Sequence, residues 1–182
     1  LACGAQPMAN EDDAVWVALN GEIYNFLELR AGLETGGHRF RTHSDTESIV
    51  HLYEDLGAAC IPRFRGMFAI ALWDAPRRTL LLASDRIGKK PLYWFEDAEG
   101  IYFASEIKAL LVLPNCPTEV DPRAIDLFLA YQSIPGASTI FRGVNRLPPA
   151  STLTWSPTGG TRIERYWELD WTRKTDLTYE DA

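Results

Sequence analysis

The sequence has little cysteine, no excess of positive charge and no long apolar run. Its three cysteines, Cys3, Cys60 and Cys116, form no Cys-x-x-Cys pair, which indicates reduced thiols in a cytoplasmic protein. The formal net charge of −7 argues against nucleic acid as a partner, because neutralising phosphates requires a basic face. No apolar run approaches the roughly 18 residues of a membrane span, and no signal peptide is evident. We therefore expect neither nucleic-acid nor membrane partners.

Two common kinds of ligand site are also poorly supported. No histidine (His38, His43 or His51) is spaced from another ligand as metal sites usually require. We expect these side chains at the surface or partly packed, and we expect no metal or other cofactor in this domain. Gly88-Lys89 lacks the glycine-rich run that cradles a phosphate. The basic segment 86–90 is either a solvated turn, which we favour, or a contact with a partner domain.

The apolar content is sufficient for one folded domain. Hydrophobic residues make up 46% of the 182 residues and aromatic residues 12%, which argues against disorder. Proline and glycine become more frequent after residue 113, so we place the domain body in residues 1–170 and the start of a linker or helix in residues 171–182. The chain opens at Leu1 in a turn-like segment and closes on a helix-like beginning. We therefore expect a piece of a longer protein.

The periodicity of the apolar residues predicts an α+β fold in which antiparallel sheet predominates. Helices are expected over residues 24–33, 44–56 and 105–111 and from residue 122, and strands over 14–19 and 38–42. Three hairpins are expected, which pair 67–73 with 79–83, 91–95 with 101–104, and 151–155 with 163–167. The first two hairpins are consecutive, which predicts a meander.

The most informative stretch is 14–25. Its apolar residues Ala14 to Leu19 predict a buried strand, which should end in a turn at Asn20-Gly21, a dipeptide that permits positive φ. Glu22 follows directly. An amide side chain, an unencumbered backbone N–H and a carboxylate within three residues are suited to holding an oxyanion and a small zwitterion. The plainer alternative is an ordinary turn.

A second acidic residue, Asp45, follows Ser44. Ser44 and Glu47 have the spacing of a capping box, so Asp45 should lie at the positive end of a helix, where a carboxylate is stabilised. The favoured alternative is that Asp45 only stabilises the start of the helix and has no role in binding. A nucleophile beside a base is not apparent: Cys3 lies in a linker-like segment, and Cys60 and Cys116 are expected to be packing residues.

Five motifs, in this order, resemble the class II glutamine amidotransferase domain. The last two resemble, more narrowly, that of glutamine-hydrolysing asparagine synthetase. The motifs are Asn20-Gly-Glu-Ile-Tyr-Asn25, Ser44-Asp-Thr-Glu47, Arg65-Gly-Met-Phe-Ala69, Asp85-Arg-Ile-Gly-Lys-Lys-Pro-Leu-Tyr93 and Phe103-Ala-Ser-Glu-Ile-Lys-Ala-Leu110. The resemblance extends over nearly the whole chain, through Pro148-Pro149 and Arg165-Tyr-Trp167.

The resemblance implies an N-terminal-nucleophile hydrolase fold, in which two antiparallel sheets lie between helix layers. In that family a cysteine at the mature N-terminus attacks the side-chain amide of glutamine, with its own α-amine as base. Asn20 and Gly21 would form the oxyanion hole, and Glu22 and Asp45 would hold the α-amino group of glutamine. The ammonia would pass to a synthetase domain that uses ATP and Mg²⁺ to adenylate aspartate.

The resemblance also implies that this chain is incomplete at its N-terminus. The family's Met-Cys-Gly start lies upstream of Leu1, and Cys3 falls where the family has a glycine-rich turn, so no nucleophile is assigned in this chain. We expect this chain to be the glutaminase portion of a ligase of asparagine biosynthesis and to be inactive as it stands. A homodimer is compatible with this interpretation. The alternatives are a non-catalytic module that binds glutamine or another protein, and a partner that completes the sheet of another chain.

Overall fold

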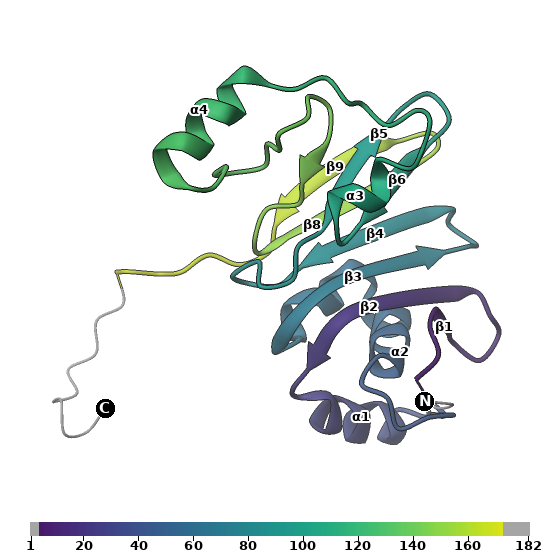
Figure 1. Ribbon diagram of the computed structural model, residues 1–182. Helices are drawn as coiled ribbons and strands as arrows, with labels where there is room; N and C mark the ends of the chain where they lie inside the picture. The colour runs from purple at the N-terminus through teal and green to yellow at the C-terminus, as the bar shows by residue number, and fades with distance from the viewer. Residues whose placement is uncertain (1–3, 173–182) are drawn as a thin grey trace, which may run out of the picture.

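Two antiparallel sheets face each other in the computed structural model, which describes residues 4–172 (Figure 1). The larger sheet has the strand order β1-β2-β3-β4-β8-β9, and the smaller has the order β6-β5-β7. The larger sheet comprises β1 (Met8–Ala9), β2 (Val15–Ile23), β3 (Gly66–Asp74), β4 (Thr79–Ser84), β8 (Ser151–Ser156) and β9 (Gly160–Arg165). The smaller comprises β5 (Tyr93–Glu96), β6 (Ile101–Ala104) and β7 (Asn145–Arg146).

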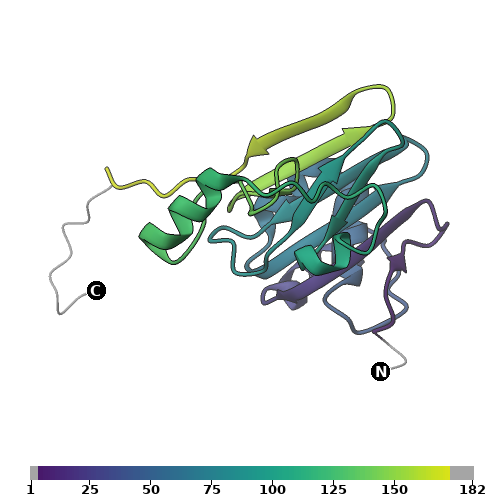
Figure 2. The same cartoon turned by 45° about the horizontal axis from the view of Figure 1, so that its top comes forward.

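Helices cover the outer faces of both sheets (Figures 1 and 2). The helices are α1 (Phe26–Thr35), α2 (Glu47–Leu56), the 3₁₀ helix η1 (Gly57–Arg63), α3 (Ile107–Leu110) and α4 (Pro122–Tyr131). One apolar core joins α1 and α2 to β2 and β3, a second lies between the sheets around Leu82, Leu92 and Leu153, and a third packs Leu110 of α3 on Phe95. The predicted α+β sandwich of antiparallel sheets between helix layers is confirmed.

Strand β2 differs from its prediction in two ways. It is half-buried rather than buried, because Val15, Val17 and Leu19 face the helices while the alternate residues Ala18 and Asn20 are exposed. It also continues to Ile23, so the turn predicted at Asn20-Gly21 is wrong.

Two glycines explain how β2 continues through that dipeptide. Gly21 has a φ of +145°, and a Cβ placed on it would lie 2.0 Å from the carbonyl oxygen of Met67 in β3. A Cβ on Gly66 would lie 2.1 Å from the carbonyl oxygen of Glu22. The positive φ of Gly21 therefore serves a close approach between two paired strands rather than a change of direction.

The segment before α2 contains two further corrections. Residues 38–42 form no strand, because the backbone N–H groups of Arg41 and Thr42 donate to the carboxylate of Glu47, at 2.6 and 2.7 Å, and not to a neighbouring strand. The predicted helix is present, but its N-cap is Thr46 and no side chain caps it. The capping box is therefore wrong, since Glu47 is engaged by the preceding loop.

The predicted meander is also wrong, because its two hairpins belong to different sheets: β3 pairs with β4 in the larger sheet and β5 with β6 in the smaller. The buried carboxylate of Asp85 organises the connection between them. It accepts four backbone hydrogen bonds of 3.0–3.1 Å, from Phe68, Ile87, Lys89 and Lys90. The basic segment 86–90 is thus a turn folded around a buried anion.

The remaining predicted elements agree with the structure to within a few residues. All three hairpins form, and α4 begins as expected, with Pro122 in its first turn and the Asp121 carboxylate accepting from the Arg123 N–H at 3.0 Å. Within residues 4–172, no helix has the length and apolar character that a membrane crossing requires. The division of the chain at residue 170 stays a prediction, because residues 173–182 lie outside the described part.

Candidate active site

A cleft of about 190 Å³ opens between the two sheets beside the middle of β2. Asn20 on β2 and Ser105, just after β6, stand on its two sides, and the Asn20 Nδ2 donates to the Ser105 Oγ at 3.0 Å. This hydrogen bond joins the larger sheet to the smaller one. The other lining residues are Ala18, Leu19, Ala69, Ala71, Leu92, Phe103 and Ala104.

The outer edge of β2 presents backbone donors beside this cleft. The Leu19 N–H donates to the Gln6 Oε1 at 2.6 Å, and the Ile23 N–H donates to the Asp45 Oδ2 at 2.8 Å. Because alternate N–H groups of a strand face the same edge, the N–H of Gly21 lies on this edge between the two. The strand thus presents two kinds of donor in succession, the amide side chain of Asn20 at the cleft and the N–H of Gly21 at the edge.

Asp45 is brought to the end of β2 by the start of α2. Besides the hydrogen bond from Ile23, its carboxylate accepts from the Thr46 N–H at 2.9 Å and from the Ser44 hydroxyl at 3.4 Å. The Glu22 side chain is exposed and has no hydrogen-bond or ion-pair partner among residues 4–172. Two carboxylates thus flank the Glu22–Ile23 peptide, one fixed by its neighbours and one open to solvent.

Neither described cysteine is suited to nucleophilic attack. Cys60 is fully buried in η1, and burial raises the pKa of its thiol to about 12. Cys116 is also buried, and burial raises the pKa of its thiol as well. The thiolate is the reactive form, so both are packing residues as predicted. Cys3 lies outside the described residues.

Sequence reasoning missed two residues that contact the candidate site. Ser105 was expected to begin a helix, but α3 begins at Ile107 and the Ser105 hydroxyl accepts from Asn20. Gln6 belongs to the linker-like opening segment, yet its side chain holds the edge of β2. The only sequence signal for Ser105 was its place within the Phe103–Leu110 motif, directly after a predicted strand.

The histidines are divided between two environments. His43 is exposed, as expected, but His51 is 1% exposed and lies beside His38 and Glu11. These three residues lie on the helix-covered side of the larger sheet and are not among the residues that line the cleft.

Comparison with known proteins identifies the family of the chain. The family model of the glutamine amidotransferase domain matches residues 1–167. Asparagine synthetase [glutamine-hydrolyzing] 1 of Bacillus subtilis is 37% identical over 98% of this chain and 28% of its own length. Asparagine synthetase [glutamine-hydrolyzing] 2 of the same organism is 47% identical over 93% of this chain and 23% of its own length. The chain thus spans less than a third of the length of these relatives.

Solved structures share the fold at lower identity. The glutamine phosphoribosylpyrophosphate amidotransferase of B. subtilis, complexed with ADP and GMP, is 21% identical, covers 89% of this chain and 32% of its own, and has a TM-score of 0.60. A class-II glutamine aminotransferase domain protein of Silicibacter pomeroyi is 18% identical, covers 91% of this chain and 72% of its own, and has a TM-score of 0.52. The predicted N-terminal-nucleophile hydrolase fold is confirmed. From the family model and the asparagine synthetase relatives together, the chain belongs to the glutamine amidotransferase domain family.

Proposed function

We propose that this domain, as part of a longer, ATP- and Mg²⁺-dependent asparagine synthetase, takes part in hydrolysing the side-chain amide of glutamine and supplies the ammonia to the rest of that protein. The observation that carries the proposal is the edge of β2, where Asn20, Gly21 and Glu22 lie in succession and the carboxylate of Asp45 is fixed 2.8 Å from the Ile23 nitrogen. The names of the relatives, which cover 93–98% of this chain, support aspartate as the acceptor. A cytoplasmic location belongs to the same proposal.

The proposed roles follow from the chemistry of amide hydrolysis. The N-terminal cysteine thiol that the family resemblance implies forms a C–S bond to the glutamine amide carbon and converts the carbonyl oxygen into an oxyanion, which the side-chain amide of Asn20 and the N–H of Gly21 stabilise. Collapse of this intermediate breaks the C–N bond and releases ammonia, and water then hydrolyses the thioester to glutamate. To contact the oxyanion, the Asn20 Nδ2 exchanges the hydroxyl of Ser105, its partner at 3.0 Å, for this oxygen. Removal of one such donor typically lowers kcat by about 10²–10³-fold.

Glu22 and Asp45 recognise the other end of glutamine in this proposal. The ammonium group of the substrate pairs with two carboxylates, and charge-assisted hydrogen bonds are stronger than neutral ones. Asp45 is already held by backbone and hydroxyl donors and offers a positioned charge. Glu22, which has no partner among the described residues, orders when the ligand arrives.

According to this proposal, the 182-residue chain on its own binds glutamine but does not hydrolyse it. Cys60 and Cys116 are buried with raised pKa values, and the resemblance assigns no nucleophilic role to Cys3. Ammonia release by this chain, if abolished by Asn20→Ala, would show that the chain supplies its own nucleophile and would overturn this part of the proposal.

Calorimetry with L-glutamine tests the substrate site. We expect saturable binding that Glu22→Gln weakens about 10-fold, a loss consistent with one charge-assisted contact. Glu28→Gln serves as the matched control, because Glu28 is an exposed acid on α1 outside the site. Glu22 is a better target than Asp45, since Asp45→Asn would also disturb the hydrogen bond to Ile23.

A non-catalytic glutamine-binding module is the second candidate, favoured by the inert state of both described cysteines. The two candidates agree on binding and differ on chemistry. Glutaminase activity measured on the native polypeptide from its own source, with its mass and N-terminal sequence, separates them. Activity there supports the ammonia-supplying domain, and binding without activity supports the module.

A further inference from the structure

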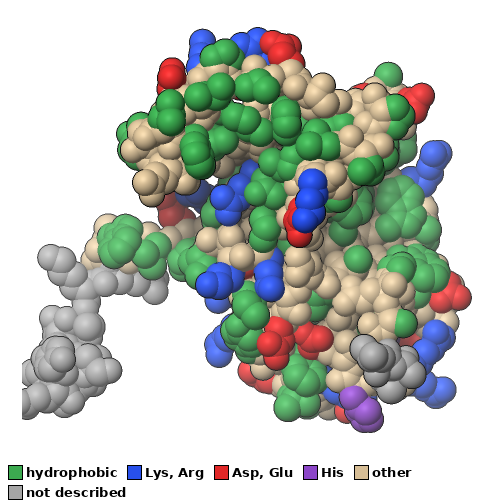
Figure 3. Space-filling model, viewed as in Figure 1, with side chains coloured by type: hydrophobic (Ala, Val, Ile, Leu, Met, Phe, Trp, Pro, Cys, Tyr) green, Lys and Arg blue, Asp and Glu red, His purple; other side chains and the backbone are tan. Residues whose placement is uncertain are grey.

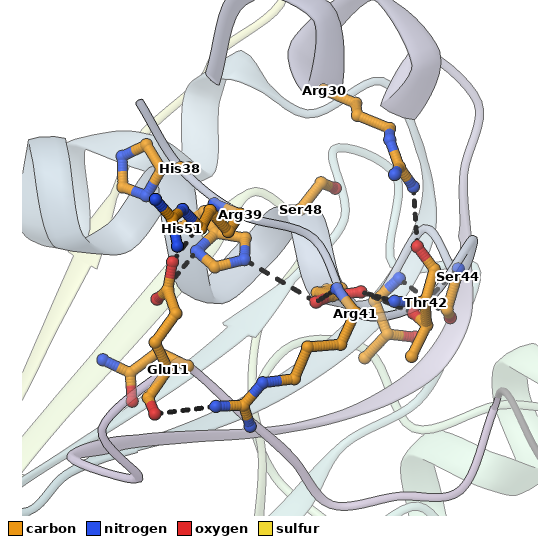
Figure 4. Close-up of polar contacts among 12 residues, drawn as sticks. Glu11, Arg30, His38, Arg39, Arg41, Thr42, Ser44, Ser48 and His51 are labelled. Carbon is orange, nitrogen blue, oxygen red and sulfur yellow. Dashed lines mark hydrogen bonds and ion pairs between the residues drawn. The ribbon is translucent and has the colours of Figure 1, made fainter. Parts of the chain in front are cut away.

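A second group of polar side chains lies beside helix α2, and Figure 4 shows three of its members, Glu11, His38 and His51, close together. It comprises Glu11 from the loop between β1 and β2, His38 from the segment after α1, and His51 and Glu54 from α2. One ligand atom from each of Glu11, His38 and His51 lies within 4.8 Å of the others. Three segments that are distant in sequence thus converge on one point.

Three of the distances between these side chains are close to the distances between ligands of one metal ion. The His51 Nδ1 lies 3.1 Å from the Glu54 Oε2 and 3.6 Å from the Glu11 Oε2, and the His38 Nδ1 lies 3.5 Å from the same Glu54 oxygen. Four ligands bound at about 2.0–2.1 Å in a tetrahedron lie about 3.3–3.4 Å apart. Glu11, His38 and His51 therefore form the centre of the candidate site, and a Glu54 oxygen lies close to both histidines.

A second layer of contacts orients three of these four side chains. The other oxygen of Glu54 accepts from the Asn10 Nδ2 at 2.7 Å, and the other oxygen of Glu11 accepts from the Arg39 N–H at 3.2 Å. The remaining nitrogen of His38 lies 3.1 Å from the Asp55 carboxylate. Metal-binding histidines and carboxylates are typically oriented by outer partners of this kind.

Burial and charge also favour a cation at this point. The side chain of His51 is 1% exposed, and its Nε2 has no hydrogen-bond partner within the described residues. The Glu47 carboxylate, which is also buried, lies 3.8 Å from that nitrogen. Three carboxylates, of Glu11, Glu47 and Glu54, thus lie around the two histidines, and a divalent cation would offset their negative charge.

We propose that Glu11, His38, His51 and Glu54 bind a zinc-like divalent cation that fastens the loop between β1 and β2, and the segment after α1, to helix α2. Two imidazole nitrogens and two carboxylate oxygens in a tetrahedral arrangement suit Zn²⁺ better than Mg²⁺ or Ca²⁺, which prefer oxygen ligands. All four coordination positions are taken by protein, so the site stabilises the fold and performs no chemistry. It is separate from the cleft at Asn20.

Zinc titration of the untagged, chelator-treated 182-residue chain tests the site. Calorimetry is expected to show one high-affinity Zn²⁺ per chain, and the midpoint of thermal unfolding is expected to rise with Zn²⁺ and not with Mg²⁺. Co²⁺ bound in place of Zn²⁺ is expected to give the visible spectrum of a tetrahedral ion. Absence of saturable Zn²⁺ binding would overturn the proposal.

Substitutions identify the ligands. His38→Gln and Glu54→Gln are expected to weaken Zn²⁺ binding by at least about 100-fold, and Asp55→Asn, an outer partner, by about 10-fold. His43→Gln is the matched control, because His43 is exposed and outside the group, and it should leave the affinity unchanged. Both His38 and Glu54 are partly exposed, so their variants should fold even if a variant of the buried His51 does not. Equal affinity in the His38→Gln and His43→Gln proteins would assign the zinc to another place and refute the site.

Discussion

At the scale of single residues, Asp85 stabilises the fold through several backbone hydrogen bonds. Asp85 lies in the connection between the two sheets, and its buried carboxylate accepts hydrogen bonds from four backbone N–H groups. Asp85→Asn replaces one acceptor oxygen by an NH₂ group that faces N–H donors. We expect a loss of roughly 2–4 kcal/mol in the free energy of unfolding, measured by urea denaturation. Asp126→Asn, at an exposed position of α4, is the control and should change it little.

Thiol labelling gives a second prediction at the residue scale. Because Cys60 is fully buried and burial raises its pKa to about 12, iodoacetamide at pH 8 should modify it only after unfolding. Peptide mapping by mass spectrometry measures the modified fraction. Rapid labelling of Cys60 in the folded chain would contradict the inert state on which the proposed lack of activity rests.

The same scale shows which parts of the candidate site could be predicted from sequence. Asn20, Gly21, Glu22 and Asp45 could be identified by residue type and motif, and the structure places all four at one end of β2. The backbone at Gly21 could not be predicted, because positive φ occurs both in turns and where two strands approach closely. Only the position of Met67 in β3 decides between them.

At the scale of elements, Asp74 at the end of β3 ties the β3–β4 hairpin to α2. It accepts from the Arg77 guanidinium at 2.6 Å and from the Tyr53 hydroxyl at 3.1 Å. Burial alone would raise the pKa of Asp74, but the hydrogen bonds from Arg77 and Tyr53 and the charge of Arg77 outweigh it and lower the pKa.

This shift predicts how stability depends on pH. A carboxyl whose pKa is lower in the folded state stabilises the fold above its unfolded pKa, near 4, and loses this effect as the pH falls through the folded value. Asp74→Asn should therefore cost about 1–3 kcal/mol at pH 7 and progressively less below pH 4. Urea midpoints of both proteins from pH 7 to pH 3 measure the difference. A difference that stays constant over this range would show that Asp74 does not act through its charge.

Elements that depend on local sequence could be predicted, and pairings between distant segments could not. The three hairpins could be predicted because each depends on a short turn with its own glycine, proline or aspartate signals. Their assignment to sheets could not, because β4 pairs with β8 and β5 with β7 across long stretches of chain. The group of Glu11, His38 and His51 was missed for the same reason, since its members come from separate segments.

At the scale of the whole molecule, α4 exposes a large apolar surface (Figure 3). Leu129 is 75% exposed and Tyr131 67%, and hydrophobic side chains gather around them. Exposed apolar patches of this kind usually mark interaction surfaces. The chain spans 28% of the length of one B. subtilis relative, so we expect this surface to contact the remainder of the longer protein.

The isolated chain should therefore self-associate through α4 as its concentration rises. Because Leu129 and Tyr131 are mostly exposed, Leu129→Gln with Tyr131→Gln should reduce this association while shifting the midpoint of thermal unfolding by no more than about 2 °C, as surface changes usually do. Sedimentation velocity over a concentration series measures the association. Leu127→Gln, at a half-buried position of the same helix, should instead lower the unfolding midpoint. If the double variant unfolds earlier, the two side chains support the fold and α4 is not a free surface.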